Sequence, residues 1–135
     1  MDQTIEYEYH RYVCPPKDGK TLYVFKYLNP LNGQMVAHLI ATVYDNESYN
    51  EIYLDELYVE PYARRQHLAS KLMEEAIKLK TNQPIYLDCY TDNYPALSLY
   101  MKFGFEIDEE YEFNDETLYR MIKKKLIRER MIFRE

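Results

Sequence analysis

Residues that bind metals or form disulfides are scarce in this sequence, which removes two classes of protein. The chain of 135 residues has two cysteines, Cys14 and Cys89, whose separation matches no metal-binding spacing. The three histidines, His10, His38 and His67, show no such spacing either. We therefore expect no metal site and no disulfide framework, and a reducing cytoplasmic setting is the default. His38 falls within a predicted strand, where we expect a core or interface residue.

Long hydrophobic stretches are also missing. No apolar run approaches the roughly 20 residues that a membrane-spanning helix requires. Residues 1–10 lack the basic region followed by an apolar region that marks a secretory signal peptide. The sequence therefore predicts neither membrane insertion nor export.

Positive charge is the third shortage, because the formal net charge is −6. This balance argues against a general nucleic-acid-binding protein, which needs a concentrated basic surface. The basic residues gather in residues 117–135, so the rest of the chain is more acidic than the total suggests. An acidic body favours small cationic partners over anionic polymers. The alternative is that the acidity serves only to keep the protein in solution.

What the sequence does contain is a series of strand signals in its first half. Apolar or alternating segments are separated by turn-forming residues such as Asn32-Gly33, a pattern that predicts consecutive antiparallel strands. The expected strands cover residues 4–13, 22–28, 34–44 and 51–59. At 47% hydrophobic residues, the chain can build a core for one α/β domain spanning residues 1–135.

The hydrophobic pattern changes its period after the fourth predicted strand. Apolar residues from Arg65 to Leu79 recur at helical spacing and predict an amphipathic helix. Residues 85–90 read as a short strand. A strand–helix–strand unit of this kind implies a right-handed crossover and a locally parallel pair of strands.

A second helix and a hairpin are expected to close the chain. Asp92 or Asn93 can cap this helix, and Pro95 fits its first turn, where a missing N–H costs nothing. Gly104 suits the C-terminal cap. Residues 105–113 and 117–127 then predict the two strands of the hairpin.

A basic turn, Arg64-Arg65-Gln66, joins the fourth strand to the first helix. The first turn of a helix carries unpaired N–H groups and the positive end of the helix dipole, and both bind phosphate. On spacing alone this signal is weak, because an exposed helix start with solubilising charges has the same appearance.

Two segments together resemble the GNAT acetyltransferase family. Val59 to Ala69 resembles that family's acetyl-CoA loop, which runs Arg or Gln, two variable residues, Gly, one variable residue, then Gly or Ala; Arg64 and Ala69 match its ends. The run Asn93, Ala96, Leu99, Tyr100, Gly104 and Phe105 matches the family's Asn-capped helix with a late tyrosine and a Gly-Phe exit.

The resemblance implies both a fold and a cofactor. The fold is a mixed sheet of about six to seven strands, with an antiparallel N-terminal meander, a parallel pair at the cofactor cleft, and two main helices. Acetyl-CoA would be the co-substrate and Tyr100 the acid that protonates the departing thiolate, which suits an ordinary phenol pKa near 10. The residues implied in cofactor binding are Leu57, Tyr58, Val59, Arg64, Arg65, Gln66, His67, Leu68, Ala69 and Asn93. Asn93 either contacts the pantetheine arm or only caps its helix.

One position departs from the family pattern. His67 stands where the family usually has glycine, which lets the backbone approach the pyrophosphate without a Cβ. A histidine in helical conformation could be accommodated, or it could block the loop.

The acceptor side of the predicted site is acidic. Asp55 and Glu56 are candidate bases for an amine that must lose a proton before attack. Because side chains alternate along a strand, we expect these two to face opposite sides. The segment around them resembles the acidic strand of diamine and aminoglycoside acetyltransferases, which accept polycationic amines. Asp108, Glu109, Glu110 and Glu112 could line the acceptor mouth or form a solvated hairpin face.

A second departure concerns the segment between the first two strands. The family usually places one or two helices there, and Cys14 to Lys20 is too short for both. The acceptor site is then open, which suits a peptide or protein amine, or is closed by a second subunit of a homodimer. The leading hypothesis is an N-acetyltransferase acting on a primary amine; the rival is a non-catalytic module that kept the fold and lost CoA through His67.

Overall fold

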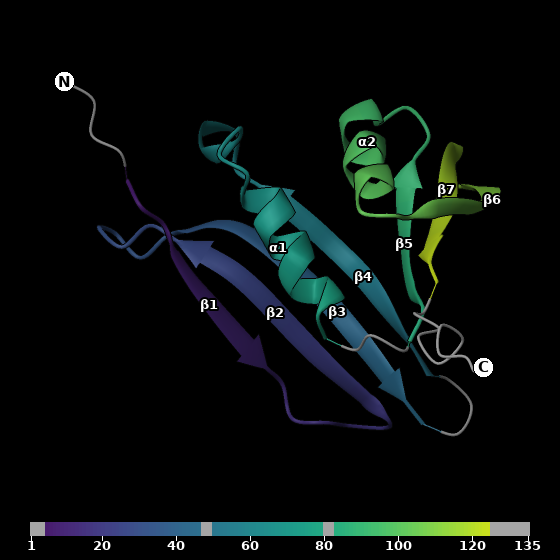
Figure 1. Ribbon diagram of the computed structural model, residues 1–135, viewed down its shortest axis with the longest axis horizontal. Helices are drawn as coiled ribbons and strands as arrows, with labels where there is room; N and C mark the ends of the chain where they lie inside the picture. The colour runs from purple at the N-terminus through teal and green to yellow at the C-terminus, as the bar shows by residue number, and fades with distance from the viewer. Residues whose placement is uncertain (1–4, 47–49, 80–82, 125–135) are drawn as a thin grey trace, which may run out of the picture.

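The computed structural model describes residues 5–46, 50–79 and 83–124. Its strands are β1 (Glu8–Val13), β2 (Lys20–Leu28), β3 (Met35–Asp45), β4 (Asn50–Val59), β5 (Ile85–Tyr90), β6 (Glu106–Phe113) and β7 (Glu116–Lys123). They form one sheet in the order β1-β2-β3-β4-β5-β7-β6, in which β4 and β5 are parallel and the other neighbours antiparallel (Figure 1). The predicted mixed sheet with an antiparallel meander and one parallel pair is confirmed.

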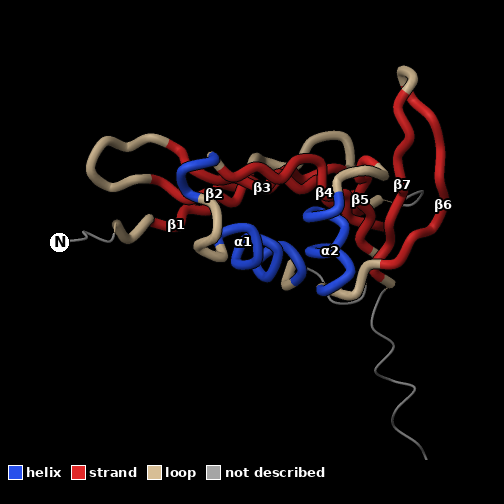
Figure 2. Tube along the Cα trace, turned by 90° about the horizontal axis from the view of Figure 1, so that it is seen from above, coloured by secondary structure: helices blue, strands red, loops and turns tan. Residues whose placement is uncertain are grey.

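Two α-helices and one short 3-10 helix complete the described chain: α1 (Leu68–Ile77), α2 (Tyr94–Lys102) and η1 (Pro61–Ala63). Both α-helices lie on the same side of the sheet, as the view from above shows (Figure 2). Residues 14–20 between β1 and β2 contain only a bridge and a turn, so no helix of the described residues covers the opposite face. Among those residues, no helix is long and apolar enough to cross a bilayer.

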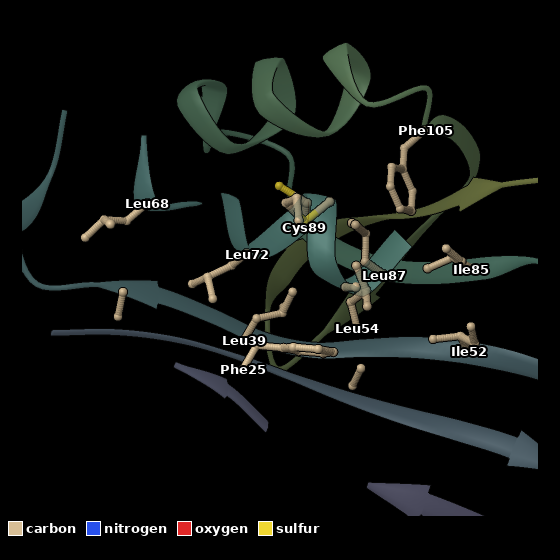
Figure 3. Packing of buried hydrophobic residues seen from close by; sticks show 14 of the residues in the cluster. Phe25, Leu39, Ile52, Leu54, Leu68, Leu72, Ile85, Leu87, Cys89 and Phe105 are labelled. Atoms are coloured by element: carbon tan, nitrogen blue, oxygen red, sulfur yellow. The ribbon is translucent and has the colours of Figure 1, made fainter. Parts of the chain in front are cut away.

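The core fills the space between the sheet and its helices. Phe25, Leu39 and Ile52 project from three neighbouring strands, and Leu72 of α1 belongs to the same buried cluster, near Leu39 (Figure 3). The apolar residues of α1 recur on one face, so burying that face fixes how the helix sits on β2, β3 and β4. This packing holds the start of α1 beside the end of β4.

The first helix begins later than its hydrophobic pattern predicts. Arg65 and His67 adopt left-handed conformations with φ of 66° and 63°, so the regular helix starts at Leu68 and not at Arg65. The basic turn is therefore a loop that enters the helix. The first strand begins at Glu8. Thr4, where it was expected to start, lies outside the described residues, and so do residues 125–127 of the last predicted strand.

The second helix follows its predicted signals closely. Asn93 is its N-cap, Pro95 lies in its first turn, and Gly104 follows its end with φ of 92°. That left-handed conformation is one that glycine adopts without steric cost, and it lets the chain leave the helix toward β6.

The parallel pair opens into a gap beyond a short paired region. β4 and β5 are in register from Ile52 with Ile85 to Leu54 with Leu87, and no further pairs follow. Past this point β5 continues to pair with β7, while the β5-facing edge of β4 has no strand neighbour. The gap thus exposes backbone N–H and C=O groups along the second half of β4.

Candidate active site

Two hollows meet at the gap between β4 and β5. The larger, about 580 Å³, runs between the end of β4, the start of α1 and the start of α2. The smaller, about 220 Å³, lies between β4 and β5 themselves. Leu57 and Tyr100 line both hollows. A ligand in one hollow would therefore reach a ligand in the other at these two residues.

The larger hollow brings together almost every residue predicted to bind the cofactor. Its lining contains Leu57, Tyr58, Val59, Arg64, Arg65, His67, Leu68, Ala69 and Asn93, joined by Ala63, Ser70, Pro95, Ala96, Leu99 and Tyr100. Gln66 is the exception, because it lines a separate hollow with Tyr7, Tyr27 and Lys71. The additional residues follow from the fold, because they lie beside the predicted ones on η1, α1 and α2.

Another hollow of similar size lies elsewhere on the described chain. It measures about 630 Å³ and is lined by residues 5–8, Pro30, Leu31 and Lys71. None of the predicted site residues belongs to it. Size alone therefore does not identify the site.

The loop before α1 presents backbone donors to the larger hollow. His67 is the N-cap residue, and its side chain makes no capping hydrogen bond. The first helical bond runs from the N–H of Lys71 to the carbonyl of His67, at 3.0 Å. The N–H groups of residues 68–70 therefore have no acceptor within the helix, and all three residues line the hollow. Together with the helix dipole, they suit an anion such as phosphate.

The conformation of His67 explains why glycine is common at this place in the pattern. Its φ of 63° and ψ of 20° are left-handed, so the expectation of a helical histidine is wrong. A residue with a Cβ pays about 1–2 kcal/mol for this conformation, whereas glycine adopts it freely. The loop nevertheless keeps the shape that leaves its N–H groups on the hollow.

Arg64 is anchored to the end of β4. Its Nε donates a hydrogen bond to the carbonyl of Val59 at 2.8 Å, and its guanidinium lies 5.8 Å from the centre of the Tyr58 ring. This contact uses one of the five N–H donors of the side chain, so the others remain for an anion. The arginine therefore brings positive charge to a defined position beside the loop.

Asn93 acts as a helix cap. Its Oδ1 accepts a hydrogen bond from the N–H of Ala96 at 3.3 Å, and the residue also borders the larger hollow. The cap is thus present, while contact with a cofactor remains a prediction.

Tyr100 stands where the two hollows join. Its ring packs edge-on against Phe105, with 6.2 Å between ring centroids, and no described residue hydrogen-bonds its hydroxyl. Burial, with a smaller contribution from nearby Cys89, raises the pKa of Tyr100 to about 12. The phenol is thus a weaker acid than the ordinary value near 10 implies, and it stays protonated throughout the physiological range.

Asp55 and Glu56 lie on the same face of the sheet, not on opposite faces as strand alternation predicts. Glu56 Oε2 is 2.6 Å from His38 Nε2, and Asp55 Oδ2 accepts a 2.6 Å hydrogen bond from Thr42 Oγ1. Because His38 and Thr42 are separated by an even number of positions on β3, they share one face. Both carboxylates also line the smaller hollow.

The cause is a β-bulge in β4. Ile40 pairs with Glu56, but the next residue, Ala41, pairs with Leu54, so Asp55 is an extra residue on its strand. A bulge interrupts the alternation of side chains and re-aims the residues that it contains. Partial desolvation raises the pKa of Asp55 above the ordinary aspartate value, while the bond from Thr42 opposes that shift.

The smaller hollow contains a third carboxylate that the sequence interpretation missed. Asp88 of β5 lines it and accepts a 3.1 Å hydrogen bond from Arg120 Nε of β7. Arg120 in turn lies over the ring of Tyr111, 5.3 Å from its centre. The available signal was a single acid in a strand whose buried and more exposed residues alternate. The acids Asp108, Glu109, Glu110 and Glu112 of β6, by contrast, are exposed.

Comparison with known proteins bears on the same region. A model described as the acetyltransferase (GNAT) family matches residues 3–105. The spermine/spermidine N(1)-acetyltransferase of Bacillus subtilis (strain 168) is 29% identical over 86 residues, which cover 60% of this chain and 55% of that protein. The chain thus spans about half the length of the curated relatives it matches.

Solved structures share the fold. Arabidopsis thaliana Naa50, in complex with the bisubstrate analogue CoA-Ac-MVNAL, has a TM-score of 0.64 at 24% identity, over 79% of this chain and 73% of that one. Chaetomium thermophilum Naa20, in complex with a bisubstrate analogue, has a TM-score of 0.68 at 14% identity, over 76% and 65%. At these identities the likeness concerns the fold.

Proposed function

The chain belongs to the acetyltransferase (GNAT) family, and we propose that it is an acetyl-CoA-dependent N-acetyltransferase that modifies a primary amine. The observation that carries the proposal is the meeting of the two hollows at Leu57 and Tyr100. One hollow has the donors that a phosphate-bearing cofactor requires, and the other is lined by carboxylates.

The larger hollow would hold the cofactor. Its pyrophosphate would lie on the N–H groups at the start of α1, with Arg64 and Arg65 supplying positive charge. The pantetheine arm would run along the unpaired edge of β4, between Leu57 and Val59, and bond the backbone groups there. The acetyl carbonyl would then lie near a backbone N–H of β4, which stabilises the negative oxygen of the tetrahedral intermediate.

The smaller hollow would hold the acceptor amine. An ammonium group must give up a proton before its nitrogen can attack, and Glu56 or Asp55 would take it. The amine then adds to the acetyl carbonyl, and the intermediate collapses by breaking the carbon–sulfur bond. Transfer is direct, with both substrates bound and no acetylated enzyme residue.

Tyr100 would act on the leaving thiolate. With a pKa of about 12, its phenol is a weaker acid than a thiol, whose ordinary pKa is about 8.5. The hydroxyl would therefore stabilise the sulfur by a hydrogen bond as negative charge develops. Full loss of its proton to the sulfur would be unfavourable, so the thiol takes its final proton from solvent.

The proposed acceptor is a polyamine-like cation. Three carboxylates line the smaller hollow, and a relative at 29% identity is named as a spermine/spermidine acetyltransferase. A protein amine is the second candidate, favoured by the sheet face that no described helix covers. A second copy of the chain could also cover that face in a homodimer.

The alternative function is a non-catalytic module that keeps the fold with weakened CoA binding. The left-handed histidine in the loop is the feature that would support it. The decisive experiment is calorimetric titration of acetyl-CoA into the purified protein, followed by an acetylation assay with a panel of amines. Micromolar binding and transfer support the enzyme. Absence of binding at millimolar acetyl-CoA supports the module, especially if His67→Gly restores it.

A further inference from the structure

His38 makes a close polar contact beside the proposed site. Its Nε2 lies 2.6 Å from Glu56 Oε2, and the His38 side chain is 13% exposed while that of Glu56 is 58% exposed. An imidazole nitrogen this close to a carboxylate oxygen must carry a hydrogen, because two lone pairs would repel at that distance. His38 Nε2–H therefore donates to Oε2 and leaves Oε1 without that bond.

The histidine is itself held in place. It lies within β3, paired with Lys26 of β2 on one side and with Tyr58 of β4 on the other. Its ring is 6.1 Å from the ring of Tyr58, between centroids. A partly buried ring in the middle of a sheet has few alternative rotamers, so its N–H points in one direction. Glu56 is largely exposed, so without its contact to His38 its side chain would have several rotamers available.

We propose that His38 is a positioning residue that holds the Glu56 carboxylate ready to take the proton of the acceptor amine, an inference that rests on the proposed acetyltransferase function. The ammonium N–H bond breaks, its proton moves to Oε1 of Glu56, and its electron pair stays on the nitrogen that attacks. Glu56 becomes a neutral acid and later releases the proton to water. His38 keeps its own hydrogen throughout.

The geometry also separates Glu56 from its neighbour Asp55. Asp55 receives its hydrogen bond from Thr42, a residue that is 9% exposed, and it occupies the bulge itself. Glu56 carries the contact to the imidazole, its side chain is 58% exposed to an amine arriving from solvent, and it lines the hollow that reaches Tyr100. The structure thus assigns proton acceptance to Glu56 and leaves Asp55 to attract the cation.

The test compares His38→Leu, which removes the donor, with His38→Gln, which keeps an N–H near the same place. We expect His38→Leu to lower kcat with an aliphatic diamine about tenfold or more, as part of the contribution of a general base. KM for acetyl-CoA should be unchanged, and His38→Gln should recover most of the rate. With an aromatic amine that is already neutral at the assay pH, the loss should shrink, because no proton must leave before attack.

A matched control is available at the edge of the sheet. His10 on β1 also lies beside a glutamate, 3.6 Å from Glu8, far from the gap. His10→Leu should leave kcat unchanged. Melting temperatures of all variants identify any that fail to fold. In a Glu56→Gln background, adding His38→Leu should change kcat no further, because the partner is already lost.

The proposal would be overturned by an unchanged kcat in His38→Leu, by no recovery in His38→Gln, or by an equal loss with the neutral aromatic amine. Retained activity in Glu56→Gln would do the same. If the wild-type protein acetylates no amine, the proposed function itself fails and this inference fails with it. An active wild type that is indifferent to His38 overturns the inference alone.

Discussion

Thr42 Oγ1 donates a 2.6 Å hydrogen bond to Asp55 Oδ2, and this contact ties the bulged residue of β4 to its neighbour strand β3. It explains how a carboxylate can be held at a place where the strand's regular pattern is broken. The bulge turns the side chains of Asp55 and Glu56 to the same face of the sheet, and both carboxylates line the smaller hollow.

Replacing Asp55 with asparagine should stabilise the fold at neutral pH. Because the folded-state pKa of Asp55 is raised, its protonated form is favoured on folding. That contribution is fully present below the unfolded pKa and is lost as pH rises through the folded value. Asp55→Asn removes the cost of ionisation, so its melting temperature should exceed that of the wild type at pH 7. Solvent screening at this exposed residue limits the gain to less than about 1 kcal/mol.

The difference in melting temperature should shrink as the pH falls through the folded-state pKa of Asp55, where the wild-type carboxylate becomes neutral. Glu112→Gln on the exposed β6 strand is the control. A difference that grows at low pH would contradict the direction of the shift.

Exchanging His67 for glycine should stabilise the loop before α1. Relief of the left-handed conformation is worth about 1–2 kcal/mol, and the greater freedom of glycine in the unfolded chain returns about 0.4–1 kcal/mol of that. We expect a net gain of about 0.5–1 kcal/mol, measured by chemical denaturation. His67→Ala keeps a Cβ and should show no such gain. Equal stabilisation by alanine would mean that the side chain, and not the backbone, is responsible.

Removing the Tyr100 hydroxyl should slow transfer without weakening cofactor binding. Because removing one preorganised hydrogen-bond donor to a developing negative charge costs about 100-fold or more in kcat, Tyr100→Phe should lower kcat by that order. Calorimetry should give an unchanged affinity for acetyl-CoA. Tyr94→Phe is the control, since Tyr94 begins the same helix and is 70% exposed.

The pH profile of the wild type offers a separate check on this tyrosine. With a pKa of about 12, Tyr100 should cause no loss of kcat between pH 7 and about 10. A falling limb near pH 9 that disappears in Tyr100→Phe would show that its pKa is not raised.

Two substitutions of Arg64 should distinguish the effect of its positive charge on acetyl-CoA binding from the effect of its guanidinium geometry. Arg64→Ala removes the bond to Val59 and the positive charge, and should weaken acetyl-CoA binding about tenfold, the size of a charge-assisted hydrogen bond. Arg64→Lys keeps the positive charge but loses the planar guanidinium group, so its affinity for acetyl-CoA should lie between those of the wild type and Arg64→Ala. Arg11→Lys, on β1 at the far edge of the sheet, is the control. An unchanged affinity in Arg64→Ala would place the phosphates elsewhere.

Local patterns were enough to predict much of the architecture. The order of strands and helices, the Asn93 cap and the Gly104 exit follow from alternation, helical spacing and the conformational limits of proline and glycine, which act between neighbours in the chain. The same holds for the grouping of the loop residues around Arg64 on one hollow, because a helix start and a basic turn are consecutive. The starts of β1 and α1 were less accurate, since hydrophobic spacing continues through residues whose backbone is not regular.

The sequence by itself determined the family resemblance, the loop before the first helix and the tyrosine on the second helix, both of which line the larger hollow. The tertiary structure alone decided that Asp55 and Glu56 share a face, that Asp88 joins them, that Gln66 turns to another hollow and that His38 holds Glu56. The physical reason is that a bulge and a gap between strands are properties of the pairing between distant segments. The spacing of residues within one segment carries no information about where a bulge forms in its pairing with a distant strand.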